Sequence, residues 1–334
     1  MEIKNIFSLG ELFERVQMEN IFSDNKTFVD CTPNSSLSSI QHRYEEEKNM
    51  PGFNLPDFVN KNFTSPKAFS TDFKTVEGTS FNDHIKNLWK VLTRQPGESN
   101  NSLIPLPHSY VVPGGRFREI FYWDSFFTML GLRLSKRMDL VQNMIDNFSY
   151  LIDTFGYIPN GNRTYFLGRS QPPFFSCMIQ LLSEEKGDQI LVKYLPQLQK
   201  EYDFWMKGKE QVSDKNRFIN HLACLPDNSI LNHYWDESDT PRPEAYKHEV
   251  ELAKEVTDDK KLFRNLRAAA ESGWDFSSRW YKNSEGFSST HAAEIVPVDL
   301  NCLLLHLEQT IGRALHLTGD SKGEEKMKDL GEKL

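Results

Sequence analysis

From about residue 82 onward, the apolar residues of the chain recur with the period of an α-helix. The clearest apolar stripes lie at 144–155, 190–205 and 298–317. Gly156 and Gly319 follow two of these stripes directly, which is typical of a helix end, and Pro196 is expected to kink the third. Segments with the strict alternation of a β-strand are scarce. The pattern therefore predicts an all-α fold.

Polar and aromatic segments follow alternate predicted helices. They lie at 106–122, 157–173, 233–244 and 284–297. Helix hairpins that are connected in this way bring every second connection to the same end of the structure. We therefore expect a toroid of helix hairpins, with the motif-rich loops gathered at one face.

Residues 1–80 differ from the rest of the chain and are predicted to form an extended N-terminal arm that packs on the barrel. The arm carries several phenylalanines spaced among prolines, namely Phe53, Phe58, Phe63, Phe69 and Phe73. The helical unit is assigned to 81–334. Its last segment, 321–334, is charged and helical without a closing signal, so we expect the toroid to be incomplete at the C-terminus.

The composition limits the partners of the chain. The formal net charge of −8 argues against nucleic acid and anionic membranes as main ligands. No run of roughly 18 apolar residues is present, so no membrane span is expected. With 38% hydrophobic residues the chain can bury a large core. An uncharged small molecule is the partner that fits these values.

The N-terminal sequence and the cysteines predict a cytoplasmic protein. Glu11 and Glu14 precede any long apolar stretch, so a signal-peptide core is not seen. The cysteines are far apart and without metal-type spacing, at Cys31, Cys177, Cys224 and Cys302. Isolated thiols are typical of a reducing compartment.

The run 113–125 is the strongest functional signal. Its thirteen residues hold two arginines, two carboxylates and four aromatic residues, and begin with a Pro-Gly-Gly turn. Glycines let the backbone turn tightly and approach a ligand closely. Aromatic faces beside Arg and Asp can stack on a sugar ring and hydrogen-bond its hydroxyl groups. The run therefore indicates a polyol or carbohydrate site.

Three of the six tryptophans are followed by aspartate, at Asp124, Asp236 and Asp275. An aromatic neighbour desolvates a carboxyl group and raises its pKa, which suits a general acid. Asp275 is favoured for this role, because Phe276 and Trp280 are also close in sequence. For Asp124 and Asp236, helix capping and ligand binding remain open beside catalysis.

Several arginines occur in loop-like segments with few acidic neighbours. Arg163 and Arg169 bracket an aromatic pair, and Arg242 and Glu244 lie in a proline-flanked turn. A solvated ion pair is the alternative for any single arginine. The joint occurrence with Asn, Gln and Glu favours a shared polar site.

Signals for other chemistry are weak. Asp236, Glu237 and Asp239 could hold a divalent cation, but a solvated acidic turn explains them as well. Metal-protease, Cys-x-x-Cys, phosphate-loop and Gly-x-Ser-x-Gly motifs are absent from the sequence. No cofactor and no metal are therefore predicted.

The run 113–125, continued to Leu132, resembles the first signature of the trehalases, glycoside hydrolase family 37. Further segments match the family in the same order. They are 12–34, 160–163, 169–173, 242–244 and 271–275. The likeness extends from about residue 8 to the end of the chain.

The resemblance implies an (α/α)6 toroid, of which 81–334 is the N-terminal part, in a cytoplasmic bacterial type of trehalase. It implies inverting hydrolysis of α,α-trehalose to two glucose molecules without a cofactor, with Asp275 as general acid. The substrate-binding positions that it implies are Arg116, Phe117, Trp123, Asp124, Asn160, Arg169, Ser170, Gln171, Arg242, Pro243, Glu244 and Gly273.

One departure from the family pattern concerns the second catalytic group. The family's second signature, Gln-Trp-Asp-x-Pro-Asn-Gly-Trp-Ala-Pro, is absent, and the base lies in the family's C-terminal third. We therefore expect the base in a missing C-terminal segment; within this chain it would be sought among Glu237, Asp239 and Glu244. The alternatives are an inactive relative that at most binds sugar, and an α-toroid enzyme with another substrate.

Overall fold

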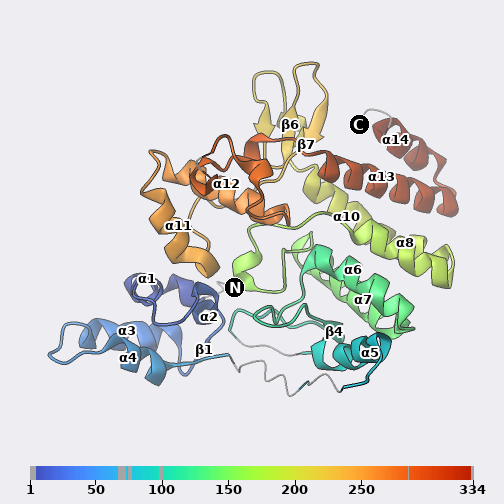
Figure 1. Cartoon of the computed structure of the whole chain (residues 1–334). Helices are drawn as coiled ribbons and strands as arrows, with labels where there is room; N and C mark the ends of the chain where they lie inside the picture. Colours follow the sequence, from blue (N-terminus) through green and yellow to red (C-terminus); the bar gives the residue numbers. More distant parts are fainter. Residues whose placement is uncertain (1–4, 67–72, 74–76, 98–100, 285, 332–334) are drawn as a thin grey trace.

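The computed structural model describes residues 5–66, 73, 77–97, 101–284 and 286–331 (Figure 1). Within them the chain is mainly helical, as the sequence predicts. The α-helices are α1 (Glu11–Met18), α2 (Asn25–Val29), α3 (Leu37–Glu47), α4 (Leu55–Asn62), α5 (Phe81–Leu92), α6 (Tyr122–Leu134), α7 (Met138–Phe155), α8 (Phe175–Lys186), α9 (Gln189–Lys193), α10 (Leu195–Trp205), α11 (Tyr246–Ala253), α12 (Asp259–Glu271), α13 (Val298–Thr318) and α14 (Ser321–Gly331).

Short strands occur only in the connections between these helices, within the described residues. They form antiparallel pairs and one three-stranded sheet: β1 (Thr32–Pro33) with β2 (Phe63–Thr64), β3 (Thr93–Arg94) with β4 (Tyr110–Val111), and β5 (Phe218–Ile219) with β6 (Leu222–Cys224) and β7 (Ile230–Asn232). They are too short to bury a face of their own, so the helices carry the fold.

The expected helix ends are confirmed. Gly156 and Gly319 end α7 and α13 in the left-handed conformation, with φ of 86° and 81°. Pro196 has a stronger effect than the expected kink, because it separates α9 from α10 and lies in the first turn of the new helix. Proline has no N–H to donate, and a helix needs none in its first turn.

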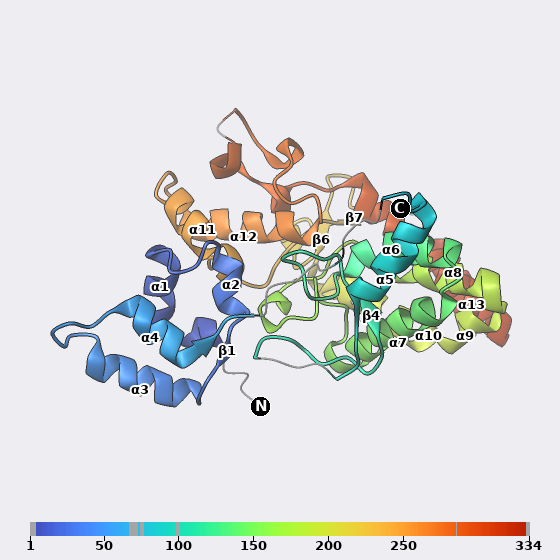
Figure 2. The same ribbon diagram turned by 60° about the horizontal axis from the view of Figure 1, so that its bottom comes forward.

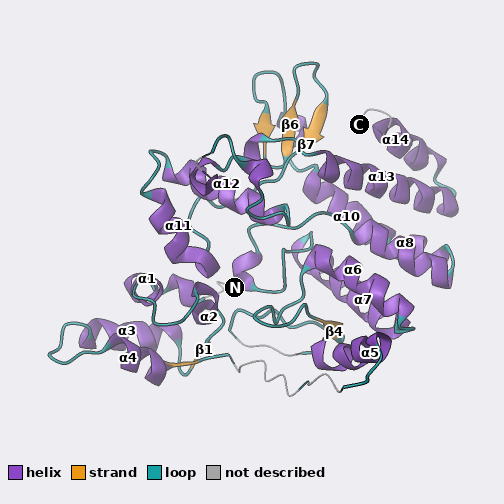
Figure 3. Cartoon of the chain, in the orientation of Figure 1, coloured by secondary structure: helices purple, strands orange, loops and turns teal. Residues whose placement is uncertain are grey.

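Short and long connections alternate along the toroid. The short ones are 135–137, 187–188 and 319–320, and the long ones are 156–174, 206–245 and 272–297. Figure 3 shows these short turns at the right-hand edge and the long connections at the other ends of the helices, with 206–245 reaching the top edge through β6 and β7. The motif-rich segments therefore belong to one end of the helix hairpins, as predicted.

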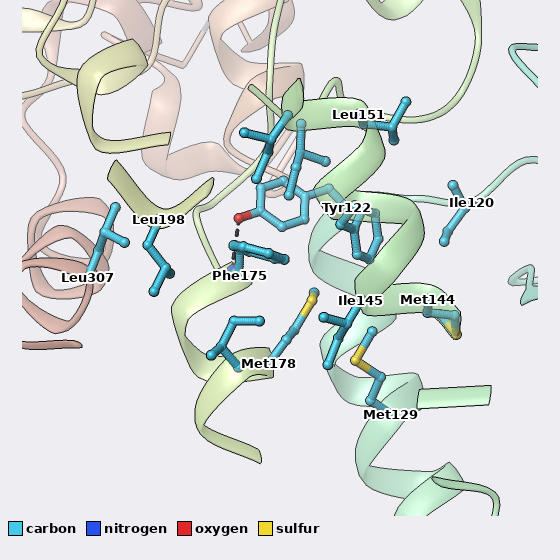
Figure 4. Close-up of a cluster of buried hydrophobic side chains, with 14 of the residues drawn as sticks. Ile120, Tyr122, Met129, Met144, Ile145, Leu151, Phe175, Met178, Leu198 and Leu307 are labelled. Carbon is cyan, nitrogen blue, oxygen red and sulfur yellow. Dashed lines mark hydrogen bonds between the residues drawn. The ribbon is translucent and has the colours of Figure 1, made fainter. Parts of the chain in front are cut away.

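The main core lies between α6, α7, α8, α10 and α13. Met144, Phe148, Phe175 and Leu307 are fully buried in it. Figure 4 shows this cluster around Tyr122, whose hydroxyl accepts a hydrogen bond from the Phe175 N–H at 2.8 Å. The same hydroxyl donates to Glu201 of α10, so the first residue of α6 is tied to the centre of the core.

The N-terminal segment is more ordered than the expected extended arm. Its described part folds into α1–α4 around a separate apolar cluster that includes Phe28, Tyr44 and Phe58. Tyr165 and Phe166 of the 156–174 loop complete this cluster, and α1 lies beside α11 in Figures 1 and 2. Aromatic residues spaced among prolines are compatible with short helices as well as with an extended chain. Phe69, which was assigned to the arm, lies outside the described residues.

Four buried charged side chains join this segment to the loops. Lys26 of α2 contacts Asp30 at 2.6 Å and Glu119 at 2.9 Å. Arg163 faces the same two carboxylates, each at 3.4 Å. Two positive and two negative charges thus neutralise one another between α2, the 113–121 loop and the 156–174 loop. We call these four residues the N-terminal charge network.

No helix in the described part of the chain is long and apolar enough to cross a membrane.

Candidate active site

Arg169 is an almost completely buried charged side chain among the predicted substrate-binding residues. Its Nη2 donates to Glu244 Oε1 at 2.8 Å, and its Nη1 contacts Asp236 Oδ2 at 3.5 Å. The Phe166 ring lies beneath the guanidinium, with 5.3 Å between the ring centroid and Cζ. The arginine therefore links the 156–174 loop to the 206–245 loop, as expected if these motifs share one site.

Arg242 is buried beside Arg169 and is held by a carboxylate that the sequence analysis did not identify. Its Nε donates to Glu249 of α11, and its backbone N–H donates to Glu249 Oε2 at 2.8 Å. Its guanidinium lies 5.0 Å from the centroid of the Phe276 ring, next to Asp275. Pro243 is buried and begins a 3₁₀ turn that also contains Glu244.

Glu244 lies between the two arginines. Burial opposes its ionisation, but the guanidiniums of Arg169 and Arg242 outweigh burial and hold the pKa of the carboxyl below its usual value. Glu244 Oε2 and Arg169 Nε are buried and find no hydrogen-bond partner among the described residues. Glu244 Oε2 can therefore still accept a hydrogen bond from a polar ligand, and Arg169 Nε can still donate one.

Asp275 lies in the turn after α12, with its side chain exposed on the loop face. The surrounding protein still removes enough water to raise the pKa of its carboxyl, although Arg242 and Arg169 act in the opposite direction. A carboxyl that is accessible to a ligand and shifted toward its neutral form suits a general acid.

Asp124 belongs to the same group. It lies in the first turn of α6, and its pKa is raised by partial burial and by the charge of Asp275. The structure thus places it both at a helix N-terminus and near Asp275, so ligand binding and capping remain compatible with it. Asp236 is different, because it is fully buried and pairs with Arg169 and Arg267.

Trp123 and Gly273 are in direct contact. Gly273 has a φ of +70°, and a Cβ added to it would lie 2.5 Å from Trp123 Cε2. Any larger residue would therefore push the indole away from the turn that carries Asp275. The Trp274 ring meets Trp123 edge to face at 5.8 Å, which adds a second contact between α6 and this turn.

Asn160, Ser170 and Gln171 are buried and hold the loops to one another. The Asn160 side chain donates to the carbonyl of Ser170 at 3.2 Å, and Gln171 Oε1 accepts from the Trp123 N–H at 3.1 Å. The Ser170 hydroxyl donates to the Ile158 carbonyl at 2.7 Å. These residues therefore have a structural role in addition to the sugar contacts expected of them.

Arg116 and Phe117 lie at the exposed tip of the 113–121 loop. They form a cation–π pair at 5.6 Å, above a tight turn in which Gly114 and Phe117 exchange backbone hydrogen bonds. Contacts from Phe117 to Phe121, from Phe121 to Phe166, and from Phe166 to Arg169 lead back to the buried arginine. Within the described residues, no hydrogen bond, ion pair or ring contact joins Arg116 or Phe117 to Asp275.

The carboxylates considered for the missing base lie in different places. Glu237 is exposed and lines a separate cavity of about 410 Å³ with Tyr157 and Trp235. Asp239 pairs with Arg264 at 3.6 Å. Of the three, Glu244 is the one in the group around Asp275. The acidic turn is also unsuited to a cation, because Arg169 and Arg267 already occupy Asp236.

Glu271 is the main residue that sequence reasoning missed. It is fully buried and accepts hydrogen bonds from the backbone N–H groups of Ser170 and Trp235, both at 2.8 Å, and from His221 Nε2 at 3.0 Å. Its position four residues before Asp275 in a motif-rich segment was the available signal. His221 and Arg267 give no such signal, because isolated His and Arg residues are common on helices and in loops.

The comparisons with known proteins identify the family of the chain. The family model described as Trehalase matches residues 20–334. The chain belongs to the trehalase family. It is 51% identical over 318 residues to the periplasmic trehalases of Salmonella newport (strain SL254) and Salmonella schwarzengrund (strain CVM19633), covering 93% of this chain. The matched region is 55% of each relative, so the chain spans about half the length of these trehalases.

A solved trehalase has a similar fold. Neutral trehalase Nth1 from Saccharomyces cerevisiae superposes with a TM-score of 0.51 at 24% identity, covering 67% of this chain and 44% of that one. The likeness confirms the expected all-α toroid of helix hairpins.

The prediction of a cytoplasmic location, and of a cytoplasmic type of trehalase, is wrong. The similar trehalases from Salmonella are named periplasmic, at 51% identity over most of this chain. Isolated cysteines report only that the chain lacks a disulfide framework, and periplasmic proteins do not require one. In general, export from the cytoplasm is directed by an N-terminal signal that is later removed, so the composition of a folded domain does not reveal the compartment.

Proposed function

We propose that this member of the trehalase family hydrolyses α,α-trehalose to two glucose molecules by an inverting mechanism, with Asp275 as the general acid. The observation that carries the proposal is the position of Asp275: exposed on the loop face, shifted toward its neutral form, and beside Arg169, Arg242 and Glu244. This combination provides a proton donor next to charged groups that can orient sugar hydroxyls.

In the proposed reaction, Asp275 donates its proton to the oxygen that links the two glucose units. The bond between this oxygen and the attacked anomeric carbon breaks. A water molecule forms the new bond to that carbon from the opposite side, and its proton passes to a second carboxylate. The two carboxyl groups of an inverting glycosidase are roughly 6.5–9.5 Å apart, which leaves room for the water.

The second carboxylate is proposed to come from a segment that corresponds to the unmatched part of the longer relatives, which exceed this chain by nearly half their length. The substrate-binding group is proposed to include Arg116, Phe117, Trp123, Asp124, Asn160, Arg169, Ser170, Gln171, Arg242, Pro243, Glu244 and Gly273. The division into an N-terminal segment, 1–80, and a part of the catalytic toroid, 81–334, belongs to the same proposal.

A second candidate function is sugar binding without turnover. It is favoured by the separation of the candidate bases, since Glu237 lines a separate cavity and Asp239 pairs with Arg264. Glu244 also has its pKa lowered by two arginines, which makes it a weak base.

The deciding experiment measures glucose release from α,α-trehalose by the wild-type chain and by Asp275→Asn, together with calorimetric titration of both proteins with trehalose. Release that disappears in the variant supports the catalytic proposal. An equal amount of α- and β-glucose in the first NMR spectra would indicate inversion at one carbon. Binding without release by this chain is expected if the base lies in the additional segment; it supports the second candidate if a protein extended to the length of the relatives binds trehalose and also releases no glucose. Undiminished release by Asp275→Asn would overturn the assignment, and neither binding nor release from folded protein would overturn both.

A further inference from the structure

Glu271 occupies a position that helix stability does not explain. It is the last residue of α12, where the negative end of the helix dipole disfavours an anion. Its side chain is completely buried, and the carboxylate accepts from donors outside its own helix. A buried charge at the unfavourable end of a helix requires compensation from those donors.

The donors come from two loops of the site. Glu271 Oε1 accepts from the Ser170 N–H at 2.8 Å, in the 156–174 loop, and Oε2 accepts from the Trp235 N–H at 2.8 Å, in the 206–245 loop. His221, also in the 206–245 loop, approaches both oxygens, at 3.0 and 3.1 Å. One carboxylate therefore fixes the separation of two loops that share no helix.

Each of these bonds fixes the backbone next to a proposed substrate contact or next to the counter-ion of one. Ser170 lies between Arg169 and Gln171, and Trp235 precedes Asp236, which pairs with Arg169 at 3.5 Å. Glu271 thus holds both the 156–174 loop, which carries Arg169, and the 206–245 loop, which carries the Asp236 counter-ion of Arg169. Its own helix continues into the Gly273 turn that carries Asp275, which brings the third loop into the same arrangement.

We propose that Glu271 is a positioning residue: its carboxylate holds the 156–174 and 206–245 loops in register with the turn that carries Asp275. This inference rests on the proposed function. It means that trehalose affinity depends in part on Glu271, a side chain that is not itself a sugar contact. The role differs from general stabilisation of the fold, because it predicts loosening of two named loops while the helical core stays intact.

The test compares Glu271→Gln with the wild-type chain. Glutamine keeps the shape of the side chain but offers one acceptor oxygen, and its NH2 group faces a donor N–H. We expect trehalose affinity, by titration calorimetry, to fall by on the order of 10–100-fold. Where the chain turns over, the loss is expected in KM, with kcat changed less than about 3-fold, because Asp275 itself is unaltered.

A second readout needs no sugar. Amide hydrogen exchange of peptides from 160–174 and 230–240 is expected to speed up in Glu271→Gln, while peptides from α7 and α13 stay protected. His221→Gln removes one of the donors and is expected to change the same peptides less. This variant keeps the test available if Glu271→Gln does not fold.

Glu201→Gln is the matched control. Glu201 is another fully buried carboxyl, but it accepts from Tyr122 in the core and touches neither loop. Affinity and loop exchange are expected to match the wild type in this variant. Unchanged loop exchange in folded Glu271→Gln, or in His221→Gln where the first variant does not fold, would overturn the positioning role. Absence of trehalose binding by the wild type would overturn only the proposed function, since the exchange result stands without it.

Discussion

The protein contains two buried charge networks that differ in how completely their members are satisfied. In the N-terminal charge network, Lys26 and Arg163 face Asp30 and Glu119, and each cation contacts both carboxylates. In the network around the site, Arg169 contacts Glu244 and Asp236, and Arg242 contacts Glu249. Arg267, which also contacts Asp236, brings the site network to three cations and three carboxylates, so net charge does not distinguish the two networks.

The difference lies in the unused hydrogen-bonding capacity. At the site, Arg169 Nε and Glu244 Oε2 remain without a hydrogen-bond partner within the described residues, and Asp275 is exposed beside them. In the N-terminal network, Tyr165 and Ser102 supply additional hydrogen bonds to Asp30 and Arg163. Glu119 Oε1 finds no hydrogen-bond partner among the described residues, but it is ion-paired with Lys26 Nζ at 2.9 Å. A closed network stabilises the junction between segments, whereas an open one leaves groups that a ligand can satisfy.

The largest effect is expected from breaking the closed network. Glu119→Gln leaves Lys26 and Arg163 with one carboxylate between them in a site that excludes water. Removing one partner of a buried ion pair costs about 3–5 kcal/mol of the free energy of unfolding. Urea denaturation of the variant measures this value. The double variant Glu119→Gln/Lys26→Met should recover part of this lost free energy of unfolding. A loss of less than about 1 kcal/mol in Glu119→Gln alone would contradict a closed network.

Glu201 differs from the carboxylates of both networks, because it is a buried carboxyl group that pairs with no cation among the described residues. Burial raises its pKa to about 8 from 4.5. The unfolded state therefore loses this proton at lower pH than the folded state does, and stability falls as the pH rises from about 4.5 to about 8. We expect a decrease on the order of 2–4 kcal/mol between pH 5 and pH 8.

Glu201→Gln removes this titration. Denaturant unfolding at pH 5, 6.5 and 8 is expected to show a smaller loss of stability in the variant than in the wild type, with the variant more stable at pH 8. Parallel curves for the two proteins would show that Glu201 does not titrate in this interval.

Removing a charge from the site network is expected to lower trehalose affinity more than it lowers the stability of the fold. Glu244→Gln keeps the size of the side chain but removes the charge that faces Arg169. A hydrogen bond to a charged group contributes about 1.5–3 kcal/mol, so trehalose affinity should fall about 10–100-fold. Calorimetry measures the affinity, and thermal unfolding serves as the control. A large drop in melting temperature with unchanged affinity would place Glu244 with the closed network instead.

The sequence predicts the helices well because their signals are local. The apolar stripe of α7 and the glycine after it lie within one continuous segment, 138–156, and the same holds for α13 and its glycine in 298–319. The helices of the N-terminal segment are harder to predict from the sequence. The short helices α1–α4 depend on packing against Tyr165 and Phe166, which are about a hundred residues away. Propensity alone does not reveal such contacts.

The site shows the same division. Asp275 and the Arg242–Glu244 turn were predicted from unusual residue types in loops, and their roles stay predictions. Sequence reasoning missed three residues whose importance depends on partners from distant segments, namely Glu271, His221 and Glu249. Glu271, for example, accepts a hydrogen bond at 2.8 Å from the backbone N–H of Ser170, about a hundred residues earlier. A glutamate at the end of a helix is ordinary in sequence. It becomes informative only when its burial and its donors are known.

The smallest effect is expected for an exposed pair that resembles the buried ones only in its distance. Arg313 and Asp188 are 2.8 Å apart, close to the 2.6 Å of Lys26 and Asp30, but both side chains are about half exposed. Water and salt screen such a pair, and ordering two flexible side chains offsets the attraction. Asp188→Asn should therefore change the free energy of unfolding by less than about 0.5 kcal/mol, measured by urea denaturation at low and at 0.5 M salt. A loss comparable to that of Glu119→Gln would mean that distance, and not exclusion of water, sets the strength of ion pairs in this protein.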